Sequence, residues 1–311
     1  MIARTAGSVI AVALFAAAAG PVGHEDATLA VRLPSGASRL FWQASRAPVQ
    51  WTAADAGLIG LVAWHPGQPG GGVEWATLPI AGQGEAYALT LVLARIDPQA
   101  VSFHLVWDIE QDRAAWTVDR ANGAALALNA GMFVEQLPWG WVVSDGRERL
   151  PPGHGPLSSA LVGLADGRLV WIDGDDVSKW RGPAERDLRF AFQSYPTLLA
   201  DDGAVPAALR NGAINDTHRD ARLALGLDRR GRLLVAMTRL DIPVPGADRV
   251  PFGLTVPEMA AVMGALGAQH AMLLDGGISA QLTISDSTGH ARVWKGLRKV
   301  PLALVARAGR R

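Results

Sequence analysis

Residues 254–282 read LTVPEMAAVMGALGAQHAMLLDGGISAQL, and this stretch combines a helix, an apolar strand and a polar turn. Thr255 stands three residues before Glu258, which is the spacing of a capping box at a helix N-terminus. The spacing predicts a helix that begins after Thr255 and ends at Gly267, a residue type that favours helix termination. An apolar strand follows and ends at Asp275, directly before two glycines.

Strand signals run through most of the remaining chain. Apolar runs at 29–33, 39–43 and 57–64 predict short strands. Further strands are predicted over 72–80, 87–96, 101–109, 167–174, 231–240 and 270–277. The segment HPGQPGGG at 65–72 predicts a loop or linker. We therefore expect an α+β fold with a mixed β-sheet core, a few flanking helices and a single main domain.

The N-terminus has the pattern of a secretory signal peptide. Arg4 precedes an apolar stretch with small residues near its end. An uncleaved membrane anchor is the alternative, but the apolar stretch is shorter than the roughly 20 residues that span a bilayer. Gly20-Pro21 would also break such a helix. We expect a periplasmic or secreted protein without a membrane span after cleavage, divided into a signal peptide (1–22), a β-rich extension and linker (23–72) and a main domain (73–308).

The composition excludes several classes of protein. The 311 residues contain 29 Lys+Arg and 29 Asp+Glu, so there is no basic excess for non-specific binding to nucleic acid. Hydrophobic residues make up 49% of the chain, which a disordered protein would not have. Cysteine is absent, which removes disulfides and thiolate chemistry. The seven His residues have no metal-ligand spacing, and no P-loop occurs, so we expect no metal and no cofactor.

Two segments place polar side chains at predicted strand ends. Asn129 follows an apolar run and precedes Gly131, where the backbone can approach a ligand closely. An Asn turn with Phe133 in the core is the alternative. Gln193 and Ser194 follow another apolar run and can bind hydroxyl or phosphate oxygens, although a strand end with a proline turn explains them equally well.

Two further segments carry charge. His218, Asp220 and Arg222 share one face of a predicted strand, and an arginine fork suits phosphate or carboxylate. A simple pair between Asp220 and Arg222 is the alternative. Asp275, at the end of a buried strand, either caps its turn or acts as a catalytic or hydroxyl-binding group. Trp139 and the nearby Trp141 can line a carbohydrate site or serve in packing.

In order along the chain, these segments resemble the phosphodiester glycosidase family, in particular its bacterial members. The resemblance runs from near Val73 almost to Val305. The segments that carry it are LVLARIDPQAVSFHLVW, ALNAGMF, GWVVSDGRE, FQSYPTLLADDG, RLALG and LTVPEMAAVMGALGAQHAMLLDGGISAQL. The chain departs from the family pattern at Tyr195, Leu223 and Ile278, where the family has glycine, a hydroxyl residue and glycine.

The resemblance implies both a site and a reaction. The catalytic residues that it implies are Asn129, Arg222 and Asp275. For substrate binding it implies Gly131, Gly276, Gly277 and Ser279, with Gln193 and Ser194 as further members. His218 is added as a substrate-binding residue because it shares a strand face with Arg222. In the reaction, water cleaves the sugar C1–O bond of a glycosyl-1-phosphodiester, so the partner is a small-molecule or glycan phosphodiester.

The role of each charged group follows from this reaction. Arg222, with His218, would bind the phosphate, and Asp275 would stabilise the anomeric cation or activate water. Glu135 or Asp220 is the candidate for a second carboxylate. Two alternatives remain: an inactive periplasmic glycan-binding protein, as the changes at Leu223 and Ile278 allow, or a metal-dependent phosphodiesterase.

Overall fold

The computed structural model describes residues 27–83, 88–155, 157–181, 187–211 and 217–309. The predicted signal peptide lies outside these ranges and stays a prediction. None of the helices in the described ranges has the length and apolar character that a bilayer crossing requires.

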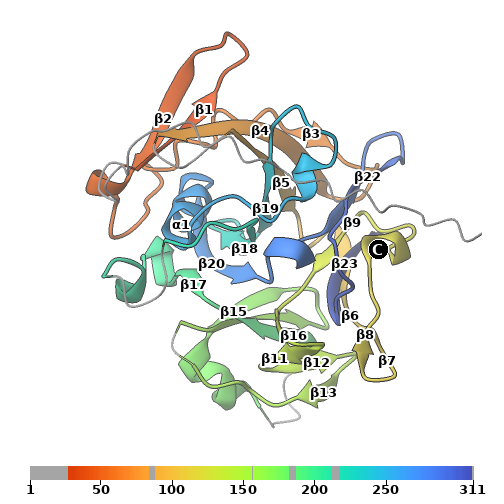
Figure 1. Cartoon of the computed structure of the whole chain (residues 1–311). Helices are drawn as coiled ribbons and strands as arrows, with labels where there is room; N and C mark the ends of the chain where they lie inside the picture. The colour runs from red at the N-terminus through yellow and green to blue at the C-terminus, as the bar shows by residue number, and fades with distance from the viewer. Residues whose placement is uncertain (1–26, 84–87, 156, 182–186, 212–216, 310–311) are drawn as a thin grey trace, which may run out of the picture.

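The largest layer is a nine-stranded sheet, which occupies the upper part of Figure 1. Its strands are β1 (Thr28–Arg32), β2 (Ser38–Gln43), β3 (His65–Pro66), β4 (Val73–Gln83), β5 (Leu89–Ile96), β17 (Thr197–Leu199), β18 (Leu223–Asp228), β19 (Leu233–Leu240) and β20 (Ala268–Leu274). The strand order is β17-β20-β18-β19-β5-β4-β1-β2, and β3 pairs with β4.

Two five-stranded sheets form the rest of the body. The second sheet contains β6 (Val101–Trp107), β9 (Leu126–Asn129), β21 (Leu282–Ser285), β22 (Ala291–Trp294) and β23 (Leu302–Ala308), in the order β22-β21-β9-β23-β6. The third, at the bottom of Figure 1, contains β12 (Val142–Ser144), β13 (Arg147–Leu150), β14 (Ser159–Leu164), β15 (Leu169–Asp173) and β16 (Leu188–Ser194), in the order β13-β12-β16-β14-β15. Two hairpins complete the strands: β7 (Ile109–Glu110) with β8 (Arg113–Ala114), and β10 (Met132–Val134) with β11 (Leu137–Trp139).

The central strands of the large sheet are apolar on both faces because two separate cores cover them. In β5, Leu91 and Leu93 pack into one core, whereas Val92 and Ala94 pack into the other. This alternation follows from the two-residue period of a strand. One core contains α1 (Val256–Ala265), and the other contains apolar residues of the second and third sheets. A strand that is buried on both sides shows a continuous apolar run in its sequence.

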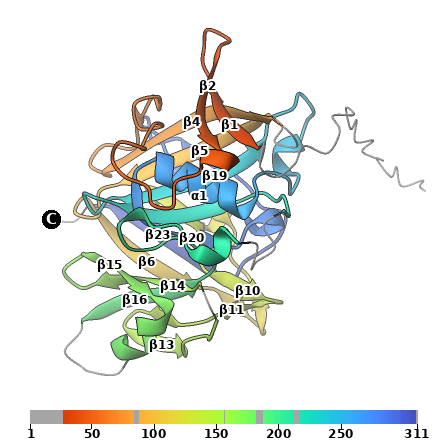
Figure 2. The ribbon, with the colours of Figure 1, turned by 90° about the vertical axis from the view of Figure 1, so that its left-hand side faces the viewer.

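The helix forms as the sequence predicts. The Thr255 side chain accepts a hydrogen bond from the Glu258 amide, and the Glu258 carboxylate accepts one from the Thr255 amide, so the capping box is complete. Glu258 also accepts bonds of 2.7 and 2.9 Å from the guanidinium of Arg219. The helix packs against β17 and β20, and Figure 2 shows it inside the body below β1, β2 and β4. It therefore fixes the strand whose end carries Asp275.

Most of the predicted strands are confirmed, but the prediction for 57–64 is wrong. These residues form turns in which Leu58 and Val62 are buried and the Val62 amide donates to the Leu58 carbonyl at 3.2 Å. The apolar period here is four residues, as in a helical turn, whereas a strand has a period of two. Part of the predicted loop at 65–72 forms β3.

The expected α+β class is confirmed only in part, because β-sheet predominates. In the described ranges α1 is the one α-helix, and the other helical segments are short 3₁₀ turns. The expectation of a mixed sheet is wrong, since every strand pairing in these ranges is antiparallel. Antiparallel neighbours need only short turns, whereas parallel neighbours need crossover connections. The division at 72/73 stays a prediction, and strands from both sides of it share the large sheet.

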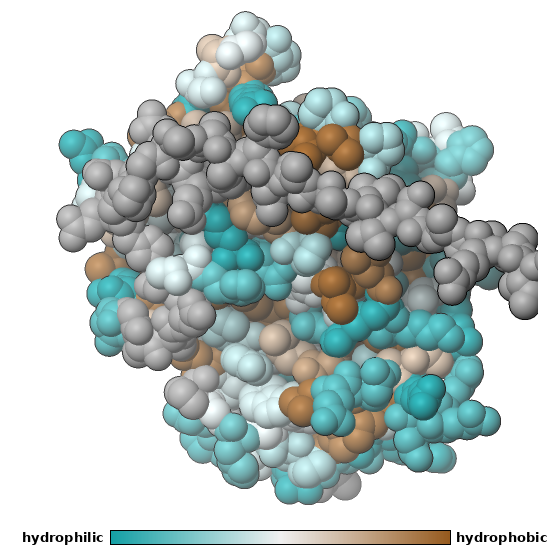
Figure 3. Space-filling view, in the orientation of Figure 1, coloured by the Kyte–Doolittle hydropathy of each residue, from teal (hydrophilic) through white to brown (hydrophobic). Residues whose placement is uncertain are grey.

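On the face shown in Figure 3, hydrophilic and hydrophobic residues are interspersed.

Candidate active site

Strand ends from the nine-stranded sheet and from the third sheet meet at one pocket of 540 Å³. Asp275 follows β20, Asp220 and Arg222 precede β18, and Tyr195 follows β16. The hairpin β10–β11 supplies Met132 and Trp139, so the pocket draws on segments that are far apart in the sequence. The residues that line it are Met132, Trp139, His154, Gly155, Leu157, Tyr195, Pro196, Asp220, Arg222, Val256, Leu273, Leu274, Asp275 and Gly276.

Asn129 lies behind the pocket and holds its wall in place. Its side chain is fully buried, and its Nδ2 donates to the backbone carbonyl of Asp275 at 2.8 Å. Its Oδ1 accepts from the Gln281 amide at 3.0 Å. The Asp275 amide in turn donates to the carbonyl of Gly131 at 2.9 Å. These bonds tie the end of β9 to the end of β20, so both polar atoms of the Asn129 side chain have protein partners.

Asp275 is a partly buried carboxylate with a cationic partner. Arg298 Nη2 donates to its Oδ2 at 2.7 Å, and the Asp275 side chain is 20% exposed. Burial raises the pKa of Asp275, while a hydrogen bond with Ser279 and the charge of Arg298 oppose that rise. Arg298 Nε also donates to Ser279 Oγ at 2.6 Å. Asp275, Ser279 and Arg298 therefore form one hydrogen-bonded group at the pocket.

The two glycines after Asp275 let a neighbouring segment approach. A Cβ at Gly276 would lie 2.3 Å from the Ala221 carbonyl oxygen. Gly277 has a φ of +53°, and a Cβ there would lie 2.9 Å from Oδ2 of Asp220. Its amide donates to the Ala221 carbonyl at 2.7 Å. Glycine at both positions thus allows the segment that carries Asp220 to pack against the turn that carries Asp275.

Asp220 is the second carboxylate of the pocket. Burial raises its pKa, and the negative charge of Asp275 adds to the rise, while the charge of Arg222, a hydrogen bond from the Ala221 amide and the charge of His218 oppose it. Burial is the largest cause of the raised pKa, and Asp275 is the smallest. Glu135, the other expected partner, is exposed in the turn between β10 and β11 and does not line the pocket.

Arg222 lines the same pocket with part of its guanidinium already fixed. Its Nε donates to the Leu254 carbonyl at 2.8 Å, and its Nη2 donates to the His218 carbonyl at 2.7 Å. Within the described ranges its Nη1 has no hydrogen bond to protein. His218 itself is exposed. The fixed fork leaves one nitrogen that can bind an oxygen of a ligand.

Gln193 and Ser194 are buried, and protein groups already occupy their polar atoms. Gln193 Oε1 accepts from the amides of Trp141 and Gly153, at 3.0 and 2.9 Å. Its Nε2 donates to the Gly153 carbonyl and to Ser158 Oγ. Ser194 Oγ donates to the carbonyl of Leu273, at 2.6 Å. Neither residue lines the pocket, and the binding roles predicted for them stay predictions.

Tyr195, the first of the three departures from the family pattern, lines the pocket, and the other two lie in different surroundings. Leu223 is fully buried in the core between the sheets. Ile278 is 42% exposed, and its carbonyl accepts from the amides of Leu297 and Arg298, at 2.7 and 3.3 Å. The backbone of Ile278 therefore helps to position Arg298.

Arg298 is the residue of this site that the sequence reasoning missed. The one signal that could have indicated it is the basic segment KGLRK at 295–299, which interrupts an otherwise apolar C-terminal region. The sequence does indicate Trp139 as a candidate for a carbohydrate site. Trp139 lines the pocket and meets Tyr195 edge-on, with ring centroids 5.1 Å apart. Trp141 is buried, and its Nε1 donates to Glu148 at 3.1 Å.

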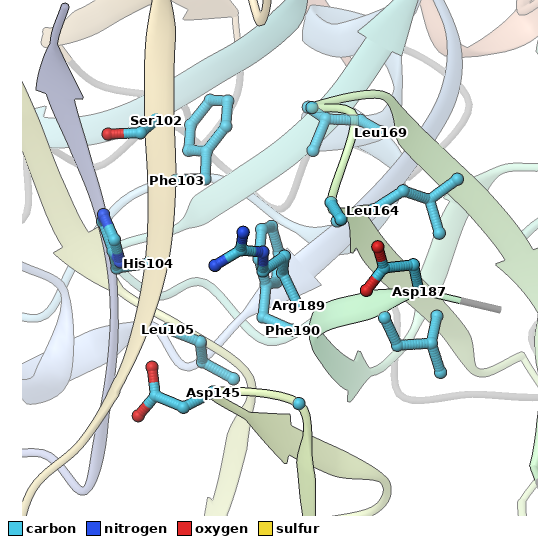
Figure 4. Close-up of a pocket in the computed structure, with 15 residues that line it drawn as sticks. Ser102, Phe103, His104, Leu105, Asp145, Leu164, Leu169, Asp187, Arg189 and Phe190 are labelled. Carbon is cyan, nitrogen blue, oxygen red and sulfur yellow. The ribbon is translucent and has the colours of Figure 1, made fainter. Parts of the chain in front are cut away.

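A larger pocket of 730 Å³ lies at the opposite end of β16 and contains none of the predicted site residues (Figure 4). In Figure 4, Arg189 points into its middle, between His104 on one side and Asp187 on the other.

Two partly buried carboxylates with arginines beside them at one pocket are candidates for acid–base chemistry and for stabilising a developing charge. A family model described as phosphodiester glycosidase matches residues 122–307, which is more than half of the chain and includes every predicted site residue. The chain therefore belongs to the phosphodiester glycosidase family, and it is a hydrolase.

A comparison with solved structures gives one match that shares the fold and a weaker one. The catalytic domain of zebrafish N-acetylglucosamine-1-phosphodiester alpha-N-acetylglucosaminidase, auto-inhibited by pro-peptide, matches with a TM-score of 0.58 and 17% identity, over 80% of this chain and 88% of that one. A hypothetical protein from Synechocystis matches with a TM-score of 0.49 and 17% identity, over 76% of this chain and 62% of that one. A comparison with curated protein sequences gives no significant match.

Proposed function

We propose that this enzyme hydrolyses the C1–O bond of a glycosyl-1-phosphodiester, and that it acts after export on an envelope or extracellular glycoconjugate. The observation that carries the proposal is the group formed by Asp275, Arg298 and Ser279, of which Asp275 lines one pocket together with Asp220 and Arg222. The family membership supports the same reaction class. The signal-peptide pattern at the N-terminus supports export.

The reaction needs an anion beside C1 and a cation at the phosphate. A water oxygen forms the new bond to C1 while the C1–O bond to the phosphate breaks and its electron pair leaves with the phosphomonoester. Asp275, which Arg298 helps to keep ionised, stabilises the positive charge that develops at C1 or accepts the proton of the water. The free Nη1 of Arg222 binds a phosphate oxygen.

The remaining residues have supporting roles in this proposal. Asp220 is the second carboxylate, and burial raises its pKa, which favours a role as the group that donates a proton to the leaving oxygen. Trp139 and Tyr195 offer ring surfaces for the sugar. Asn129 acts through the backbone, because both of its polar atoms bind the segment that carries Asp275.

A panel of sugar-1-phosphodiesters, including one of N-acetylglucosamine, tests the proposal. We expect release of free sugar that a chelator does not change and that Asp275→Ala abolishes. Binding of these compounds without turnover would instead indicate a glycan-binding protein. Cleavage that a chelator abolishes would indicate a metal-dependent phosphodiesterase.

A further inference from the structure

A second pocket, of 910 Å³, lies beside Arg298. The turn of the hairpin β7–β8 forms part of its lining, and the loop after β22 forms another part. Its polar lining residues are Glu110, Gln111, Arg113, Gln136, Arg298 and Lys299. None of the residues predicted from the sequence for the site lines this pocket.

The pocket carries excess positive charge in a protein of zero net charge. Arg113 and Lys299 are exposed, and in the described part of the chain neither forms an ion pair. Glu110 is the one acidic residue of the lining, and it already accepts a bond of 3.0 Å from Arg120. Two cations are therefore available to a ligand.

Arg298 connects this pocket with the candidate active site. It lines the basic pocket, and its Nη2 donates to the Asp275 carboxylate, which lines the other. The hairpin β10–β11 also contributes to both pockets. Met132 lines the candidate active site, and Gln136, in the turn of the hairpin, lines the basic pocket. A substrate that reaches past Arg298 from the candidate active site thus meets Arg113 and Lys299.

We infer that the basic pocket is a subsite for the aglycone, and that it selects phosphodiesters whose aglycone carries a second phosphate. This inference rests on the proposed function, because it assigns the part of the substrate beyond the scissile bond. A phosphate monoester carries a charge of about −1.5 to −2 at pH 7 and offers three acceptor oxygens. Both available cations can bind it, although solvent screens each contact.

Binding of two product-like compounds tests the subsite without any turnover. Propyl phosphate carries one phosphate, and 1,3-propanediol bisphosphate carries two. By calorimetry we expect the bisphosphate to bind the wild-type protein about tenfold more tightly, which corresponds to ~1.4 kcal/mol. In the double variant Arg113→Gln/Lys299→Gln the ratio of the two binding constants should fall to about two. A factor of about two remains because either phosphate of the bisphosphate can occupy the active site.

The matched control is Arg229→Gln/Arg230→Gln, which removes the same charge from the exposed turn between β18 and β19. It should keep the tenfold ratio, and thermal unfolding of both double variants should match the wild type. An equal ratio in wild type and Arg113→Gln/Lys299→Gln, or an equal loss in the control, would overturn the subsite. Failure of the wild type to bind the bisphosphate would overturn it as well.

Turnover separates this inference from the proposed function. The substrates are one sugar-1-phosphodiester with a propyl aglycone and one with a phosphopropyl aglycone. We expect the phosphopropyl compound to have the higher kcat/KM, and the Arg113→Gln/Lys299→Gln variant to lose that preference. If neither compound is cleaved while the calorimetric preference persists, the proposed function fails, and the pocket binds a second phosphate without being an aglycone subsite. If both are cleaved with the same ratio in wild type and variant, the subsite fails alone.

Discussion

The two ends of β16 each open into a pocket, and the two pockets differ in how they hold charge. At the end near Tyr195, Asp220 and Asp275 are desolvated enough to have raised pKa values, and each has an arginine beside it. At the other end, Arg189 is exposed and has no ion pair within the described ranges. The pocket beside Arg189 has a volume of 730 Å³, and the pocket beside Tyr195 has a volume of 540 Å³.

The difference separates the two pockets by the burial of their charged groups, whereas a choice by volume would favour the pocket with exposed charges. A charge in water interacts weakly with its neighbours, whereas a partly buried charge interacts strongly and titrates at an altered pH. Hydrogen bonds from Arg298 and Ser279 also hold Asp275 in one orientation, which catalysis needs. We therefore expect substitutions at the Tyr195 end of β16 to affect activity strongly, and matched substitutions at the other end to affect it little.

The largest effect should come from Asp275→Asn. The amide cannot accept a proton or stabilise a cation at C1, so we expect kcat to fall about 10³-fold in the sugar-release assay. Asp145→Asn in the other pocket is the matched control and should leave kcat unchanged. An Asp275→Asn enzyme that keeps a tenth of its activity would show that this carboxylate is not the essential anion.

The next largest effect should come from Arg298→Gln, which removes the cation beside Asp275. We expect kcat/KM to fall about 30-fold at neutral pH, within the range of a lost charge-assisted contact. Loss of the positive charge raises the pKa of Asp275 further above its ordinary value, because the ionised form loses a partner. Activity that depends on the ionised form disappears as the pH falls through that pKa.

The acid limb of the pH–rate profile should therefore lie at a higher pH in Arg298→Gln than in the wild type. Arg189→Gln removes the same charge at the other pocket and should leave the limb in place. A lower rate with an unmoved limb would assign Arg298 a structural role only.

A smaller effect is expected from the aromatic pair. Trp139→Ala or Tyr195→Ala removes a surface on which a sugar can lie, and this contact is the same in the bound substrate and in the transition state. We expect KM to rise about tenfold with kcat nearly unchanged, which is the signature of lost uniform binding. A fall in kcat at constant KM would indicate that the rings act in the chemical step.

The smallest effect is expected from Arg189→Ala and His104→Ala in the pocket of Figure 4. Both side chains are exposed, and surface substitutions of this kind change stability by about 0.5 kcal/mol or less. Activity should stay within about twofold of the wild type, since in the described part of the chain no hydrogen bond or ion pair joins either side chain to Asp275. A tenfold loss would show that both ends of β16 contribute to the reaction.

The sequence predicts the parts of the site that depend on local patterns. The capping box of Thr255 and Glu258 fixes the start of α1, and the apolar run of β20 places Asp275 at a strand end. Each of these two features depends on fewer than ten consecutive residues, so a local sequence pattern is enough to predict it. The structure places Arg222 and Asp275 at one pocket, whereas Asn129 bonds to the backbone of Asp275 and does not line that pocket.

Other parts depend on contacts between distant segments, which one sequence does not reveal. Arg298 reaches Asp275 across 23 positions because the hairpin β21–β22 brings the chain back. The sequence predicts that the Asn129 side chain points into a cleft. It does not reveal that the backbone amide of Gln281, 152 positions away, donates to the Asn129 Oδ1. The turns at 57–64 look like a strand because a run of eight mostly apolar residues is compatible both with the two-residue period of a strand and with the longer period of helical turns.

The central claim is that water attacks the sugar carbon and not the phosphorus. Hydrolysis of a glycosyl-1-phosphodiester in water enriched in oxygen-18, followed by mass spectrometry of both products, tests it most directly. The account predicts that the phosphomonoester stays unlabelled, and this product decides the test because the C1 oxygen of a free sugar also exchanges with water. Label in the phosphomonoester would mean that the P–O bond breaks, and it would contradict the role assigned here to Asp275.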